Sequence, residues 1–93
     1  MGYIEVEEFA LAGVGADEFA RLDAELQAWT YVNRPGVLRR TTARSEDGDV
    51  LVLTHFGGTA PPAPPPPGAT PVDGFQAAVD PTSYRRVVYR DLD

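Results

Sequence analysis

The chain has 93 residues, of which 43% are apolar, and its 14 acidic and 8 basic residues give a net charge of −6. This length fits one domain, and so short a chain buries only about 60–65% of its unfolded surface, which favours assembly with a second copy. The acidic balance argues against a nucleic-acid or anionic-membrane partner, because both need a basic surface. The absence of cysteine excludes disulfides and thiolate metal sites.

The first residues, MGYIEVEEFAL, lack the basic start and the apolar stretch of a signal peptide. No apolar run approaches the ~20 residues that a membrane helix needs. We therefore expect a cytoplasmic protein whose residues 1–93 form a single domain.

The first predicted element is a strand over residues 3–11, with apolar residues on both faces, and two glycines end it. A helix is predicted from Asp17 to about Val32. Its apolar stripe, at steps of three and four, consists of Phe19, Leu22, Leu26 and Trp29. The sequence Asn33-Arg34-Pro35-Gly36 ends this helix, because the residue before a proline disfavours helical geometry.

Two strands are predicted next, over residues 37–45 and 49–56, with an Asp-Gly turn between them that is typical of a hairpin. The second of them, VLVLTHF, is apolar on both faces, which indicates a central strand.

Residues 57–72 form a proline-rich insertion that holds seven of the nine prolines. Proline lacks the N–H that helices and sheets need, so this segment is predicted to be polyproline II or irregular loop. Three interpretations stay open: a disordered insertion, a lid, or an arm that docks a partner.

A short helix over Asp73–Val79, capped by Asp73, and a strand over Tyr84–Leu92 complete the chain. The order strand, helix, strand, strand, short helix, strand predicts an α+β, ferredoxin-like βαββαβ antiparallel sheet with helices on one face. The other face still carries apolar side chains, so we expect it to be covered in a homodimer.

These elements, in this order, resemble the dimeric α+β barrel superfamily, and within it small proteins of the antibiotic-biosynthesis-monooxygenase type. The resemblance is carried by DEFARLDAELQAW, RPGVLRRT, the acidic turn before VLVLTHF, and F-x-A-x-V-D-P before a strand with tyrosine. It implies a barrel of two sheets with a pocket between each sheet and its helices. It also implies reactions such as cofactor-independent oxygenation of polycyclic phenols, aldol-type cyclisation and haem degradation. Where this family has a longer helix, the present chain has GGTAPPAPPPPGATP, which is expected to remove a pocket wall.

Three residues are candidates for catalysis. His55, the only histidine, ends the most apolar strand and has a side chain suited to acid-base chemistry, although packing is the alternative role. Arg40, or its neighbour Arg39 on the opposite face, is suited to bind a carboxylate or phenolate. The alternatives are a surface charge or a pair with an acidic residue of the first strand, Glu5 or Glu7. Tyr84 is a candidate donor to a developing enolate, with packing or dimer contact as the alternative.

Four more residues are predicted to hold a hydrophobic aromatic or polyketide-like substrate: Trp29, Tyr31, Asn33 and Phe75. Core packing is the alternative for Trp29, and a helix-ending role is the alternative for Asn33. A pocket of apolar walls with few polar groups suits such a ligand.

No cofactor and no metal ion are expected, because one histidine with no supporting spacing makes no ligand set, and the nucleotide-binding and serine-hydrolase motifs are absent. The leading hypothesis is a small secondary-metabolism enzyme, a cofactor-independent monooxygenase or cyclase. The alternatives are a non-catalytic module that binds partners through its proline-rich segment, and a stress-response-type dimer without a substrate. The lysine-free, Ala/Arg/Pro-rich composition suggests a bacterial host with GC-rich DNA.

Overall fold

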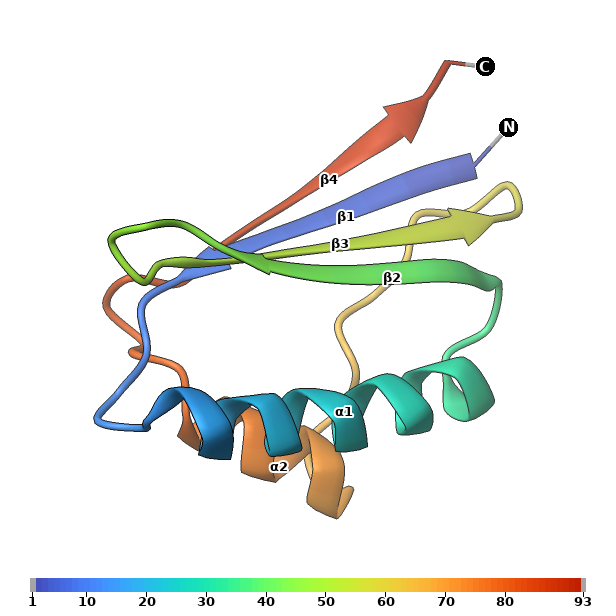
Figure 1. The fold of residues 1–93 in the computed structure, drawn as a ribbon. Coiled ribbons are helices and arrows are strands. Elements are labelled where there is room, and N and C mark those ends of the chain that lie inside the picture. The colour runs from blue at the N-terminus through green and yellow to red at the C-terminus, as the bar shows by residue number, and fades with distance from the viewer. Residues whose placement is uncertain (1, 93) are drawn as a thin grey trace.

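The structure, a computed structural model, describes residues 2–92. A four-stranded sheet forms one layer and two helices form the other (Figure 1). The elements are β1 (Gly2–Phe9), α1 (Ala16–Asn33), β2 (Val37–Arg44), β3 (Val50–Gly57), α2 (Thr70–Ala77) and β4 (Arg85–Asp91). The predicted order of strands and helices is confirmed.

The strands lie in the order β2-β3-β1-β4, and each neighbouring pair is antiparallel. The two central strands pair along their whole length, from Gly2 opposite Gly57 to Phe9 opposite Val50. This topology, with both helices on one face, confirms the predicted ferredoxin-like α+β fold.

The hydrophobic core lies between the sheet and the two helices. Successive residues of a strand point to opposite faces, and Phe9 of β1 points toward the helices. Its ring meets those of Phe19 in α1 and Phe75 in α2, with centroids 6.3 and 5.7 Å away. The buried members of the core are Phe9, Phe19, Val50, Val52, Phe75, Ala78 and Val79.

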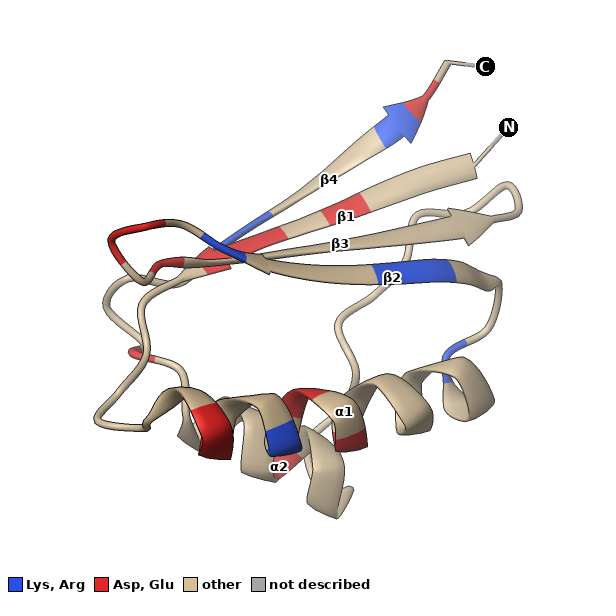
Figure 2. Cartoon of the chain, in the orientation of Figure 1, with Lys and Arg blue, Asp and Glu red and all other residues tan. Residues whose placement is uncertain are grey.

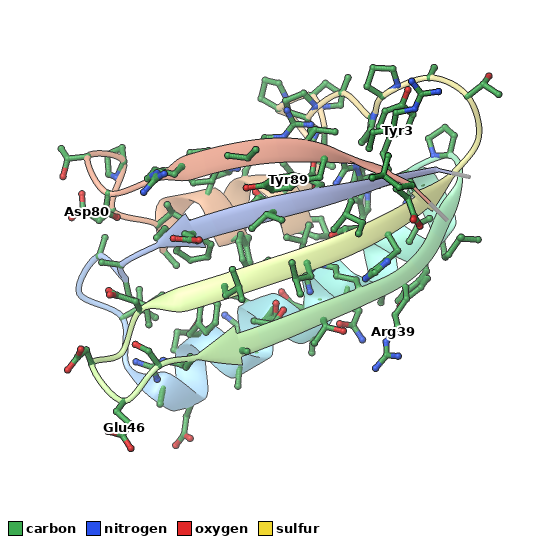
Figure 3. The ribbon with its side chains drawn as sticks, turned by 90° about the horizontal axis from the view of Figure 1, so that it is seen from above. Tyr3, Arg39, Glu46, Asp80 and Tyr89 are labelled. Atoms are coloured by element: carbon green, nitrogen blue, oxygen red, sulfur yellow. The ribbon has the colours of Figure 1, made fainter. Side chains whose placement is uncertain are left out.

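The opposite face of the sheet, called the open face below, is covered by no element of residues 2–92 (Figures 1 and 3). Its apolar side chains are Ile4, Val6, Leu51, Leu53, Val87 and Tyr89. Val87 and Tyr89 keep 40% and 55% of their surface exposed. The sequence predicted this uncovered apolar face.

Most element boundaries differ from prediction by one to three residues, and the start of α2 and the end of β1 are among the larger shifts. Helix α2 begins at Thr70 and not at Asp73, because Pro71 fits the first helical turn, where its missing N–H leaves no bond unmade. The Asp73 carboxylate instead accepts the Gly68 N–H, at 3.0 Å, from inside that turn. Strand β1 ends at Phe9, and Leu11 makes only an isolated bridge with Val79. Neither helix of residues 2–92 is long and apolar enough to cross a membrane.

Residues 58–69, called the proline segment below, run from the end of β3 to the start of α2 (Figure 1). Three of the segment's carbonyl oxygens accept hydrogen bonds from the body of the domain, one of them that of Thr59, 3.4 Å from the Tyr3 hydroxyl. Arg34 donates to Ala63 and Arg86 donates to Pro62, each at 2.8 Å. These bonds hold the segment against the body of the domain.

Candidate functional site

A pocket of about 390 Å³ lies between the end of α1, the end of β3 and the proline segment. We call it the proline pocket. It is lined by Trp29, Asn33, Arg34, Pro35, Phe56 and residues 60–66. Apolar walls with few polar groups are typical of small-molecule sites. The proline segment supplies one wall of this pocket.

The end of α1 shapes one side of the pocket. The last two turns of this helix carry no charged residue (Figure 2). The Asn33 amide donates to the Trp29 carbonyl at 2.9 Å and closes the final turn. Gly36 then adopts a φ of +80°, which favours glycine, and its carbonyl accepts the Gly57 N–H at 2.8 Å. This reversal holds the end of α1 beside the end of β3.

Arg34, the first residue after α1, forms the charged wall of the pocket. Its Nη1 and Nη2 atoms donate to the two carboxylate oxygens of Glu5 in β1, at 2.8 and 2.9 Å. Arg86 of β4 reaches the same carboxylate, with Nε 2.9 Å from Oε2. The guanidinium of Arg34 also lies over the Phe56 ring, 4.7 Å from its centroid, in cation–π geometry.

The cluster of Glu5, Arg34 and Arg86, called the arginine cluster below, is withdrawn from water. The side chain of Glu5 is 1% exposed and that of Arg34 is 10% exposed. Burial by itself raises the pKa of Glu5, but the hydrogen bonds and charges of the two arginines outweigh it and hold that pKa below its usual range. Glu5 is therefore an anion held between two cations.

A second buried carboxyl, Glu7, pairs with Tyr84. The Tyr84 hydroxyl donates to Glu7 Oε2 at 2.7 Å. Burial raises the pKa of Glu7 against the opposing effect of this hydrogen bond, and burial together with Glu7 raises the pKa of Tyr84. The structure thus commits the Tyr84 hydroxyl to Glu7, and Tyr84 does not line the proline pocket.

Arg40 lies between β2 and α1, away from the proline pocket. Its Nη1 is 2.8 Å from Asp23 Oδ1, and its side chain is 3% exposed. The sequence offers Glu5 or Glu7 as partners for this arginine. That pairing is wrong, because the inward position of Arg40 on an edge strand faces Asp23 of the helix. The Arg40 backbone N–H donates to the Tyr31 hydroxyl at 2.8 Å. Tyr31 therefore supplies a hydrogen-bond acceptor to the edge strand β2.

His55 and Phe75 also lie away from the pocket. His55 shares the open face with Leu51 and Leu53, opposite to the helices, and pairs in register with Ile4. Phe75 is 3% exposed and belongs to the core. Of the seven predicted site residues, the structure brings Trp29 and Asn33 together at the proline pocket.

Two residues of the pocket, Arg34 and Phe56, were not predicted from the sequence to bind a ligand. Arg34 was recognised there only as part of the signal that ends the helix. A usable signal was Glu5, which shares its strand face with the apolar Phe9, because a carboxylate among core positions needs a cationic partner.

A larger hollow, of about 490 Å³, lies at the far end of the open face. Open-face residues Glu8, Ala43, Leu51 and Arg85 are among those that line it, beside the acidic turn between β2 and β3 (Figure 2). It lies outside the sheet–helix layer and would adjoin any molecule that covers the open face. We therefore place the candidate ligand site in the proline pocket. Within residues 2–92, no three histidine, aspartate or glutamate side chains are placed to share a metal ion.

Comparison with known proteins bears on the fold. No protein-family model and no curated protein matches the chain. Among solved structures it is similar to SnoaB, described as a cofactor-independent oxygenase from Streptomyces nogalater, with a TM-score of 0.73 and 18% identity over 99% of this chain and 94% of that one. It is also similar to Rv0793 from Mycobacterium tuberculosis, with a TM-score of 0.56 and 13% identity over 100% of this chain and 97% of that one.

The chain shares the α+β fold of these two structures. This agrees with the single-chain fold that the resemblance to antibiotic-biosynthesis-monooxygenase-like proteins implied. A shared fold establishes how the sheet and helices are arranged. It does not establish a reaction, which depends on the residues of the site.

Proposed function

We propose that this protein binds a hydrophobic aromatic or polyketide-like molecule in the proline pocket and acts on it as a cofactor-independent oxygenase or cyclase. The observation that carries the proposal is the pocket itself, in which the Trp29 indole, the Phe56 ring and the prolines surround a single guanidinium, that of Arg34. The similarity of fold to SnoaB, described as a cofactor-independent oxygenase, supports it. The host would be a bacterium and the location its cytoplasm.

The role we assign to the pocket is stabilisation of a substrate anion. A phenol or enol that loses its proton gains from a cation held in an apolar site, because charges interact more strongly where water is excluded. The resulting electron-rich anion reacts with oxygen or with a carbonyl of its own chain. The lining residues include no carboxylate and no imidazole, so the proton leaves to solvent.

We also propose that the protein is a homodimer whose two open faces meet. Val87, Val6 and Leu53 form one apolar row across β4, β1 and β3. Burial of such a surface supplies the stability that a domain of this size otherwise lacks. His55 would then be an interface residue.

Binding is tested by titration with anthrone and 1-naphthol, with the released heat and the Trp29 fluorescence as the two signals. Activity is tested by measuring oxygen uptake in the presence of anthrone. Oxidation of the anthrone CH2 group to a carbonyl consumes one O2 and releases one water. We expect binding, and oxygen uptake above the rate without protein. Trp29→Ala should weaken both at least tenfold, while Val32→Ala, an exposed change on the same helix, should not. Absence of binding by every probe overturns the proposal.

A non-catalytic binding module is the second candidate. It is favoured by the placement of the three predicted catalytic residues: Arg40 is paired with Asp23, Tyr84 donates to Glu7, and His55 lies on the open face. Tight binding of aromatic probes with neither oxygen uptake nor a cyclised product would support this candidate against the enzyme. A stress-response-type dimer would dimerise and bind none of the probes.

A further inference from the structure

The arginine cluster carries an excess positive charge beside the proline pocket. Its two guanidinium groups face one carboxylate, that of Glu5. The other buried acidic and basic groups do not cancel this excess by direct pairing. Asp23 is paired with Arg40, and Glu7 accepts from Tyr84 and makes no ion pair with either arginine within residues 2–92. The arginine cluster therefore carries one positive charge that no carboxylate balances.

Neutral oxygens occupy the donors that an anion would take. The Nη2 groups of Arg34 and Arg86 donate to the carbonyls of Ala63 and Pro62, both 2.8 Å away. A carboxylate is a stronger acceptor than a carbonyl for a guanidinium, because it carries a full negative charge and presents two oxygens to the planar donor. This difference favours exchange of a carbonyl for a ligand carboxylate.

The position of Arg34 makes this exchange accessible from the pocket. Arg34 itself lines the pocket beside Phe56, whereas the Glu5 carboxylate lies behind it and is fully buried. A planar ring held between Trp29, Phe56 and the prolines would place a substituent on the ring next to the guanidinium.

We propose that the ligand of the proline pocket is an aromatic carboxylate, whose oxygen replaces the Ala63 carbonyl on Arg34. This inference rests on the proposed function and specifies its substrate class. It further implies that ligand binding releases the proline segment from Arg34, so that the segment and the ligand compete for one donor.

The decisive experiment is calorimetric titration with 2-naphthoate and with its neutral analogue 2-naphthalenemethanol. A charge-assisted hydrogen bond predicts that the carboxylate binds roughly 10- to 100-fold more tightly than the alcohol. Equal affinity for the two probes overturns the carboxylate assignment and leaves the aromatic pocket standing. Binding of neither probe overturns the proposed function itself.

Variants locate the preference at Arg34. Arg34→Lys keeps the charge and loses the two-pronged donor, so we expect about a tenfold loss for 2-naphthoate and little change for the alcohol. The double variant Glu5→Gln/Arg34→Gln keeps the net charge of the arginine cluster, because one anion and one cation are removed together. Retention of the full carboxylate preference in either folded variant overturns the proposal. The matched control is Arg39→Lys, which makes the same exchange as Arg34→Lys at an exposed site on β2 and should leave the preference unchanged.

Discussion

Glu5 and Arg34 meet in a two-pronged ion pair that joins the central strand β1 to the end of α1, across 29 positions of sequence. The pair is buried, and its Arg34 side forms the charged wall of the proline pocket. It therefore ties the stability of the fold to the shape of the candidate site.

Glu5→Gln should destabilise the protein strongly. The change leaves Arg34 and Arg86 without their shared anion, and an uncompensated buried charge costs about 3–5 kcal/mol. Urea unfolding, followed by circular dichroism, measures this loss. The control is Glu25→Gln, which breaks an exposed ion pair with Arg21 and should change little. Similar unfolding midpoints for the two variants would show that the buried pair contributes no more than a surface one.

The two buried carboxyls should give opposite pH dependences of stability. The pKa of Glu5 is lowered from 4.5 in the folded state, so its contribution is present above about pH 4.5 and is lost as the pH falls through the folded pKa. The pKa of Glu7 is raised from 4.5, so its contribution is present below about pH 4.5 and is lost as the pH rises through the folded pKa.

Glu7→Gln isolates the second effect. The glutamine oxygen still accepts from Tyr84 but does not ionise, so the stability of the variant relative to the native chain should increase as the pH rises from 4.5 toward neutrality. Unfolding free energies measured at several pH values across this range give the trend. A constant difference between the two proteins would mean that the Glu7 pKa is the same in the folded and unfolded states.

Tyr31→Phe should lower stability and leave ligand affinity unchanged. The Tyr31 hydroxyl satisfies the Arg40 N–H on the edge strand β2, and loss of such a bond costs about 1 kcal/mol. Tyr31 is predicted from the sequence to bind substrate, but it lies outside the pocket lining. Weaker binding of 2-naphthoate in a variant of normal stability would restore the ligand role.

Val87→Asp should convert the proposed dimer to a monomer, because it puts a charge in the middle of the apolar open face. Sedimentation or light scattering gives the molar mass. Val32→Asp introduces the same charge on α1, where Val32 is 83% exposed, and should leave the mass unchanged. A native chain that stays monomeric at high concentration contradicts the dimer. His55→Ala should weaken dimerisation without altering affinity for pocket ligands.

Replacement of residues 60–67 by a Gly/Ser sequence of equal length tests whether the proline segment is part of the ligand site. The flexible chain loses the proline wall and gains conformational entropy, so affinity for 2-naphthoate should fall at least several-fold. The fold should persist, because the core residues lie outside the segment. Unchanged affinity would mean that the prolines are not part of the ligand site.

The positions of the strands and helices follow from local patterns in the sequence. Helix α1 could be predicted from the apolar stripe from Phe19 to Trp29 and the stop at Pro35-Gly36, because both signals act within a few residues. The boundary of α2 was misjudged for an equally local reason. Asp73 resembles a cap, whereas Pro71 is tolerated inside the first turn.

Periodicity and turn residues encode the order of the elements and hence the fold, and they imply that one apolar face of the sheet stays uncovered. Which of the two faces the helices cover depends on packing in three dimensions. Both faces carry apolar residues, so the alternation that groups His55 with Leu51 and Leu53 does not say whether that group faces the helices or solvent. The partnership of Glu5 with Arg34 was likewise decided in three dimensions, since it depends on where the end of α1 lies over β1.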